Sequence, residues 1–223
     1  MALPAFLVLV ALGSWQVQRL MWKSDLIAFR EAQLAAPAMP LPADLSDADA
    51  LDVIDYRRVT LSGTFVHGRE IHLAATRRGT VGFRVITPLE RDDGPAVLVE
   101  RGWVPAEARD PERRPEGQLT GAVTIEGVLR TRGRRGWFTP DNEVARNYWF
   151  WLDLPAMAAY AGEGVPPLVV EAGPAPNPGG LPVGREYRVG LTNDHLGYAI
   201  TWYALAVALA VIYVLSQRRP PDG

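Results

Sequence analysis

The histidine at position 195 stands at the entrance to the longest apolar block of the sequence. The stretch NDHLGYAITWYALAVALAVIYVLSQRR, residues 193–219, passes from polar residues through His195 into 20 uncharged residues, 196–215. Twenty helical residues cover about 30 Å, which is the thickness of the hydrocarbon core of a bilayer. An ionisable side chain within one turn of a membrane span is costly unless it has a partner. His195 is therefore the first candidate for a functional residue.

Two roles for this imidazole follow from its chemistry. A neutral imidazole can be an axial ligand of a haem whose macrocycle lies against the helix. Arg19, Lys23 and Arg188 would then be available to contact the propionates. The alternative is an interfacial histidine that helps to cap the helix beside the two polar residues preceding it. The residues alone leave both roles open.

Two apolar segments are expected to hold this chemistry in a membrane. The second is predicted as a transmembrane helix over residues 195–215, with Tyr198 and Trp202 near its outer end and paired arginines after its inner end. The first, within MALPAFLVLVALGSWQVQRLMWK, is predicted over residues 1–18 and is completed by the interfacial Trp15 and Trp22. A cleaved signal peptide is the alternative. The missing basic start and the bulky residues after Gly13 favour an uncleaved anchor.

The short tail, residues 216–223, carries the charges that predict orientation. Positive residues beside short loops stay in the cytoplasm, whereas long connecting domains do not obey this rule. Two spans place both termini on one side of the membrane. We therefore expect a two-pass protein of the inner (plasma) membrane with cytoplasmic termini and a periplasmic central domain.

The first span continues into a helical extension, residues 19–36, and prolines then begin a linker, residues 37–50. Trp15, Arg19 and Trp22 follow helical spacing and so share one face. This face is either an aromatic belt with a cation resting on it or a surface for a partner. We predict that Trp15, Trp22, Tyr198 and Trp202 form the partner-binding set.

Residues 51–190 are predicted to form a β-rich domain. Its short runs of branched and aromatic residues end at Gly, Pro or Asp, as in antiparallel meanders; they are RRVTLSGTFV, REIHLAAT, GFRVITPLE, AVLVERGWV, GAVTIEGVLR, NYWFWLD and PLVVEA. LPAMAAYAG predicts one short helix from Leu154, and GPAPNPGGLPVG predicts a loop. The fold class is thus an α+β membrane protein, in which two transmembrane helices flank an extracytoplasmic antiparallel small barrel or sandwich.

Composition excludes several functions. With 0 Cys the chain has no disulfide, thiolate metal site or CxxCH haem attachment, and a net charge of -2 gives no reason to expect nucleic acid as a partner. GxSxG, phosphate-binding glycine loops and HExxH are absent, so we predict no enzyme. His67 and His72 flank a predicted turn, but two imidazoles make a weak metal site, and we expect them at the surface. A basic loop contains Arg130, Arg132, Arg134 and Arg135. We interpret it as a solvated hairpin tip, or as a contact for anionic headgroups or propionates.

Several motifs resemble those of the Surfeit locus protein family of membrane-bound cytochrome c oxidase assembly factors. LGSWQVQRLMWK is similar to its N-terminal signature, GFRVITPL and RGWVP to its central strands, GWFTPDN and NYWFWLDLPAMA to its later segments, and NDHLGYAITWYALA to its second span. The similarity covers nearly the whole chain in the same order. His195 falls on the histidine that the family is proposed to use as a haem ligand, whereas Gly197 stands where the family often has glutamine.

The resemblance implies a function in maturing the catalytic subunit of a haem–copper oxidase, by holding or delivering haem a. The implied partners are that subunit, haem a synthase and membrane lipid, with no metal other than haem iron bound through His195. A scaffold of the same family that binds the apo-subunit without haem, and a quinol oxidase as client, are alternatives. A signal-anchored periplasmic enzyme is a third, and it requires a cluster of catalytic residues in the domain.

Overall fold

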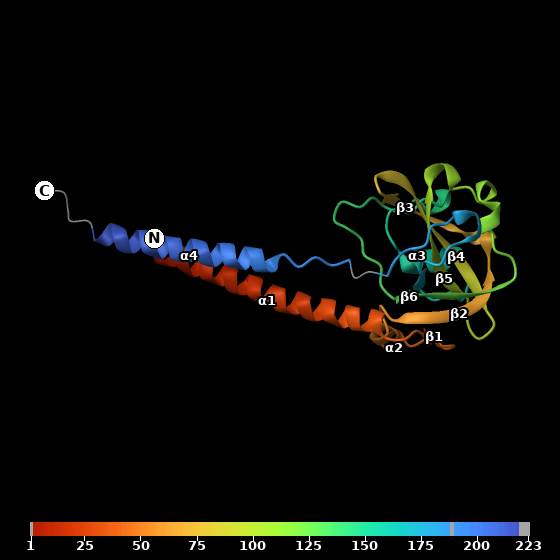
Figure 1. Ribbon diagram of the computed structural model, residues 1–223, viewed down its shortest axis with the longest axis horizontal. Helices are drawn as coiled ribbons and strands as arrows, with labels where there is room; N and C mark the ends of the chain where they lie inside the picture. The colour runs from red at the N-terminus through yellow and green to blue at the C-terminus, as the bar shows by residue number, and fades with distance from the viewer. Residues whose placement is uncertain (1, 188–189, 219–223) are drawn as a thin grey trace. The chain divides into compact units, whose positions relative to one another are not determined.

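The computed structural model of the chain describes residues 2–187 and 190–218. The chain divides into two compact units, one made of Met1–Glu31 with Val189–Gly223 and the other of Ala32–Arg188. Helices α1 (Ala2–Ala35) and α4 (His195–Gln217) supply the first unit, and strands dominate the second (Figure 1).

Helix α1 is continuous through the expected span and its expected extension, and it ends shortly before Pro37. Both α1 and α4 are long and apolar enough to cross a membrane. Only 11% of the most apolar window of each helix is buried within the protein, which distinguishes them from the core helices of soluble domains. The two helices are therefore compatible with a two-pass membrane protein, as the sequence predicted.

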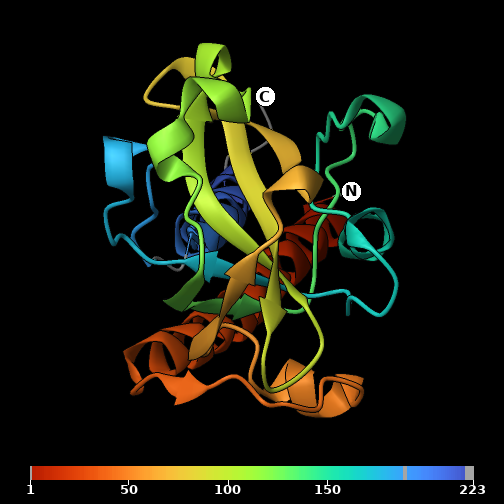
Figure 2. The ribbon, with the colours of Figure 1, turned by 90° about the vertical axis from the view of Figure 1, so that its right-hand side faces the viewer.

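The second unit contains a closed barrel of five strands. The seven strands of this unit are β1 (Met39–Pro40), β2 (Arg58–Phe65), β3 (Ile71–Arg77), β4 (Thr80–Arg91), β5 (Val97–Pro105), β6 (Ala122–Arg130) and β7 (Val169–Ala172), and all except β1 and β3 form the barrel. They are ordered β1-β2-β6-β7-β5-β4-β3, and an additional pairing of β2 with β4 closes the barrel. Most pairs are antiparallel, but β1 with β2 and β5 with β7 are parallel. Figure 2 shows β4 and β5 as two long neighbouring strands of the domain.

Closure depends on the last residues of β2, where Gly63 pairs with Arg91 and Phe65 with Leu89 of β4. A Cβ on Gly63 would collide with the carbonyl of Glu90. Glycine therefore permits the close approach that joins the two strands while β2 is still paired with β6. A sandwich, the other architecture expected from the sequence, would lack this pairing.

The core of the domain lies inside the barrel and on one outer face of the sheet. The interior cluster joins buried residues of all five barrel strands, including Val59, Leu89 and Leu129. On the outer face, helix α3 (Leu154–Ala161) packs Leu154 and Met157 against β3, β4 and β5 together with Trp149. Asp153 caps α3 by accepting a hydrogen bond from the Ala156 amide.

Two sequence expectations need correction here. NYWFWLD was expected to be a strand, but Asn147 has a left-handed backbone (φ 50°), and only isolated bridges form, between Trp149 and Leu73 and between Tyr148 and Glu143. The expected linker contains β1 and the first residues of α2 (Ala48–Val53), whose N-cap is Asp47. Short 3-10 turns complete the described part of the chain: η1 (His67–Arg69), η2 (Ala106–Ala108), η3 (Pro111–Arg113), η4 (Pro115–Gly117), η5 (Val144–Arg146) and η6 (Pro178–Gly180).

Candidate functional site

His195 is the first residue of α4, and its imidazole is turned toward α1. Its Nδ1 lies 2.7 Å from Oε1 of Gln16, a side chain that is itself buried at 8% exposure. The N-cap residue, Asp194, makes no side-chain hydrogen bond to the helix terminus. His195 therefore bridges the two helices of its unit, and its Nδ1 is not used to cap α4.

The partner of Nδ1 determines the tautomer of this histidine. An amide oxygen only accepts hydrogen bonds, so the contact with Gln16 places the proton on Nδ1 and leaves a lone pair on Nε2. Within the described part of the chain Nε2 has no hydrogen-bond partner. A second atom that fixes the ring and its tautomer is the usual support of a metal-ligating histidine. In the neutral imidazole, this arrangement leaves Nε2 as the nitrogen that can accept a hydrogen bond or bind a metal.

Close packing of α1 against α4 holds this pair in place. A Cβ on Gly13 would lie 2.8 Å from the ring of Tyr203, so a larger residue at this position would force the ring to move. The hydroxyls of Ser14 and Tyr203 are 3.1 Å apart. At the other end, Asn193 donates to the carbonyl of Leu20 at 3.1 Å. Small residues and interhelical hydrogen bonds are the usual means of association between helices in lipid.

The expected propionate contacts lie beyond Gln16 along α1. Arg19 and Lys23 follow Gln16 by three and seven residues, so they lie about 4.5 and 10.5 Å further along the axis on or beside the same face. The guanidinium of Arg19 lies 4.8 Å from the centre of the Trp22 ring. Arg188, the third expected contact, lies outside the described residues.

The four expected partner-binding side chains are accessible to different degrees. Trp15, Trp22 and Tyr198 are exposed within their unit, and Trp202 is half-buried. They are available to lipid or to a partner helix. The structure therefore presents them on the surface of the helix pair, in agreement with either interpretation of the aromatic face.

The other two histidines belong to a buried charge cluster around Glu70. The Glu70 carboxylate lies 3.6 Å from Nδ1 of His67, 3.7 Å from Nε2 of His72 and 3.5 Å from Arg101, and Arg114 forms a two-pronged ion pair with it. Both histidines were expected at the surface, but His72 is buried. The error arose because Glu70 brings both rings inward as partners. Among the described residues no three His, Asp or Glu side chains are placed so that they could hold a metal ion together, and two arginines occupy the Glu70 carboxylate.

Competing effects determine the protonation of Glu70. Burial alone would raise the pKa of its carboxyl group. Hydrogen bonds from His72 and Arg114, together with the charges of Arg114 and Arg101, outweigh burial and lower the pKa to about 2. Glu70 is therefore ionised at neutral pH.

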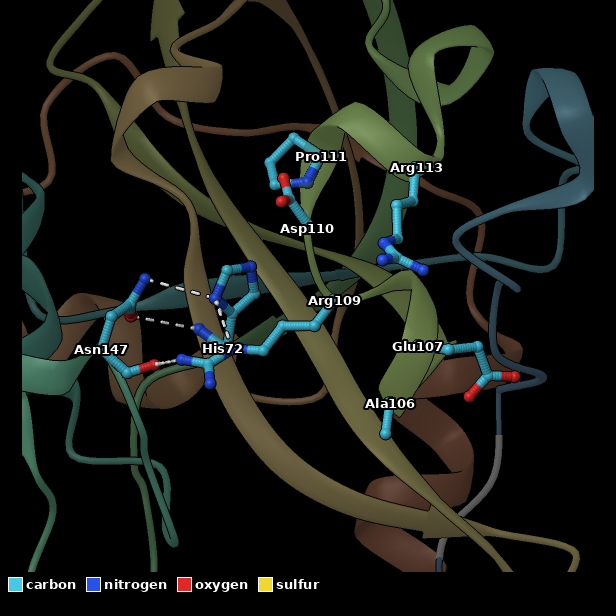
Figure 3. Close-up of a pocket in the computed structure, with 8 residues that line it drawn as sticks. All are labelled: His72, Ala106, Glu107, Arg109, Asp110, Pro111, Arg113 and Asn147. Carbon is cyan, nitrogen blue, oxygen red and sulfur yellow. Dashed lines mark hydrogen bonds between the residues drawn. The ribbon is translucent and has the colours of Figure 1, made fainter.

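A shallow hollow of about 540 Å³ lies beside this cluster (Figure 3). Arg109 is its central side chain, and its guanidinium donates to the carbonyls of Arg146 (3.1 Å) and Asn147 (2.9 Å). It also lies 4.8 Å from the centre of the Phe83 ring. Because these contacts already engage Arg109, its role in the hollow is to join the loop after β5 to the segment at Asn147.

The expected basic loop separates into structural and exposed arginines. Arg130 pairs with Glu171 (3.2 Å) and covers the Tyr56 ring, so it belongs to the barrel. Arg132, Arg134 and Arg135 are all exposed, but Arg132 pairs with Asp52 and Arg135 pairs with Asp141 at 2.8 Å, and only Arg134 has no ion pair among the described residues. Only the latter part of the loop is available to an external group.

Two residues of these sites were not found from the sequence. Gln16 shares a helical face with Gly13 and Lys23, and this polar position within an apolar span was a usable signal. Glu70 had no comparable signal, because its partners come from distant segments, as Arg101 and Arg114 do.

Comparison with known proteins identifies the family. The model of the SURF1 family matches residues 3–207. The chain is 36% identical over 229 residues to Surfeit locus protein 1 of Homo sapiens, covering 95% of this chain and 75% of the relative. It is 34% identical over 225 residues to a SURF1-like protein of Monosiga brevicollis (95% and 84%), and 35% over 219 residues to Surfeit locus protein 1 of Takifugu rubripes (91% and 89%). The family match runs from the start of α1 through the barrel and into α4, and the chain belongs to the SURF1 family.

Proposed function

We propose that this chain is an assembly factor for the catalytic subunit of a haem–copper oxidase, and that it holds haem a through Nε2 of His195. The observation that carries the proposal is the contact of His195 Nδ1 with Gln16, which leaves a lone pair on Nε2 at the end of a membrane-length helix. Membership of the SURF1 family supports the assembly role.

The environment of His195 favours a histidine that binds a cofactor over one that has no ligand. A polar side chain beside a membrane span is costly unless it is paired, and only one of the two ring nitrogens has a partner among the described residues. Iron would provide the second partner. When bound, the haem supplies a macrocycle destined for the oxidase; this chain's residues orient it and shield it from water.

The cations further along α1 suit the acidic edge of such a cofactor. Arg19 and Lys23 extend from the His195–Gln16 pair toward the polar end of the helix, where carboxylates remain hydrated. Arg188 is proposed as a third contact. Trp15, Trp22, Tyr198 and Trp202 are proposed to contact the client subunit or haem a synthase through the exposed surface of the helix pair.

The proposed location is the inner (plasma) membrane, with both termini in the cytoplasm and the barrel in the periplasm. The short basic tail after α4 supports this orientation, since positive residues in short segments stay cytoplasmic. Fusion of a reporter that is active only in the cytoplasm to the C-terminus tests it. An inactive C-terminal fusion would contradict the orientation.

The haem assignment is tested by co-expressing the chain with haem a synthase and recording the absorption spectrum after purification in detergent. We expect a Soret band in the wild type and its loss in His195→Ala. Leu196→Ala, an exposed neighbour on the same turn, should keep the band and serves as the control. A band that persists in His195→Ala would remove His195 as the ligand.

The same experiment separates the alternatives. If no form of the protein carries haem while the oxidase subunit still co-purifies with it, the chain acts as a scaffold for the apo-subunit. Extraction of the haem into pyridine distinguishes haem a from b or o by its absorption maximum. Haem b or o in the wild type would instead favour a quinol oxidase as client.

A further inference from the structure

Trp137 and Phe138 are both 100% exposed, although they are among the most apolar side chains of the domain. They lie in the loop of residues 131–141 that follows β6, here named the aromatic–arginine loop. Large apolar side chains that project fully into solvent as an adjacent pair mark a surface that meets another phase or molecule. The helix pair is a separate unit, so this observation is independent of the proposed haem site.

The loop is anchored at its base by the helix α2. Thr131 donates from its hydroxyl to Asp52 at 2.9 Å and from its amide to Asp55 at 3.2 Å. Arg132 forms an ion pair with the same Asp52. A Cβ on Gly133 would collide with the carbonyl of Leu152, so the chain passes close to that segment. These contacts fix where the loop leaves the domain.

The tip of the loop is a closed turn. The Thr139 amide donates to the Gly136 carbonyl at 3.2 Å, and the Gly136 amide donates to the Thr139 hydroxyl at the same distance. Arg135 donates to the Thr139 carbonyl at 3.0 Å. Trp137 and Phe138 are the two residues between these closing bonds. The turn therefore presents both rings together at its outermost point.

The loop leaves the barrel at the same end as both connections to the apolar helices. Leu34 in the last turn of α1, Tyr56 before β2, Arg130 at the end of β6 and Tyr187 near the end of the domain line one small cavity. Arg130 immediately precedes the aromatic–arginine loop. Both chain connections to the membrane-length helices thus start beside the base of this loop.

Charge on the loop matches the surface of a lipid bilayer. It carries three arginines and one aspartate; Arg132 pairs with Asp52 and Arg135 with Asp141, whereas Arg134 is exposed close to the aromatic pair and has no ion pair among the described residues. Tryptophan and phenylalanine partition into the interfacial region of a bilayer, and arginine pairs with lipid phosphates. A protein partner would need a complementary acidic, apolar surface, whereas a bilayer accompanies this domain whenever the two helices of the same chain span it.

We propose that the aromatic–arginine loop inserts Trp137 and Phe138 into the interface of the membrane that α1 and α4 span, with Arg134 at the anionic headgroups. The loop adds a direct contact between the domain and the bilayer to the two chain connections that join the domain to the helices. This contact limits rotation of the barrel above the lipid. It also holds one end of the barrel toward the membrane.

The absence of cysteine makes the test direct, because each introduced cysteine carries the only spin label. We would label Phe138→Cys and Pro140→Cys in the full chain, reconstituted in nanodiscs of phosphatidylcholine and phosphatidylglycerol without other proteins. Gly68→Cys is the matched control: it is exposed, a Cβ there meets no atom within 4 Å, and it follows the opposite end of β2. Power saturation measures collision of the label with oxygen, which concentrates in lipid, and with a water-soluble nickel chelate.

We expect the ratio of oxygen to nickel accessibility at position 138 to exceed that at position 68 severalfold, with position 140 between them. Adding Arg134→Gln, or replacing the anionic lipid by zwitterionic lipid, should lower the ratio at position 138. Equal, water-like accessibility at all three positions would overturn the proposal. Shielding at position 138 only when the oxidase subunit is present would also overturn it, in favour of a protein partner.

Discussion

Replacement of Glu70 by glutamine tests whether the buried charge cluster stabilises the barrel. The Glu70 side chain is 2% exposed and faces the equally buried guanidinium groups of Arg101 and Arg114. Glu70→Gln keeps the shape of the side chain and removes its charge. Two cations would then remain buried without a counter-charge, in contact with a neutral amide that can accept only part of their hydrogen bonds.

The size of the effect follows from the pKa. The ordinary pKa of 4.5 falls to about 2 in the folded protein. At 1.36 kcal/mol per pKa unit, ionised Glu70 contributes about 3 kcal/mol to the free energy of unfolding. Because the folded-state pKa is lowered, this contribution is complete above pH 4.5 and is lost as the pH falls toward 2. Removing one member of a buried ion pair costs about 3–5 kcal/mol, in agreement with this value.

The assay is urea unfolding of the full chain in detergent, followed by tryptophan fluorescence at pH 7 and at lower pH. At pH 7 we expect Glu70→Gln to lower the free energy of unfolding by about 3 kcal/mol. Glu163→Gln, an exposed carboxylate in the turn after α3, should change it by less than about 0.5 kcal/mol. Between pH 7 and low pH, the free energy of unfolding should fall more for the wild type than for Glu70→Gln. An unchanged unfolding free energy at pH 7, or identical pH dependence of the two proteins, would refute the reasoning.

Three further experiments with substituted chains test other contacts. Gly13→Ala should destabilise the helix pair because the new Cβ meets the Tyr203 ring, whereas Gly197→Ala meets no atom within 4 Å and should stabilise α4 by up to about 1 kcal/mol. Thermal unfolding followed by circular dichroism should therefore show changes in melting temperature of opposite sign for the two variants. Equal changes would contradict the packing of α1 against α4. Asn147→Ala should destabilise the domain by roughly 1 kcal/mol more than Asn147→Gly, because only glycine tolerates the left-handed backbone at no cost, and urea unfolding of both variants checks the order. Gln16→Leu should weaken haem binding about 10- to 100-fold through loss of the Nδ1 partner, measured by haem titration, and unchanged affinity would contradict the role of the amide.

The strands of the barrel could be predicted because their signal is local. The run RRVTLSGTFV alternates buried and exposed residues along β2, and six of the seven expected strands are present. The exception, NYWFWLD, shows where composition misleads. Its aromatic residues favour a strand, yet the Trp149 indole donates to the Asn147 side chain at 3.0 Å, and the segment packs as an irregular connection.

Barrel closure and the site contacts could not be predicted, because they join distant residues. Nothing in the local pattern of β2 reveals that Gly63 meets Arg91. Likewise, His195 was identified from its place at a span, but its pairing with Gln16 depends on how α1 and α4 pack, which spacing within either helix does not specify. Sequence reasoning therefore predicted His195 as a candidate ligand and missed Gln16, the side chain that contacts it.

Rescue of His195→Gly by free imidazole tests the central claim most directly. We predict that this variant loses the haem spectrum of the wild type and regains it when imidazole is added, because the added ring supplies the nitrogen that the side chain provided. The matched variant Leu196→Gly should retain the spectrum and be unaffected by imidazole. An unaltered haem spectrum in His195→Gly would contradict ligation by this residue.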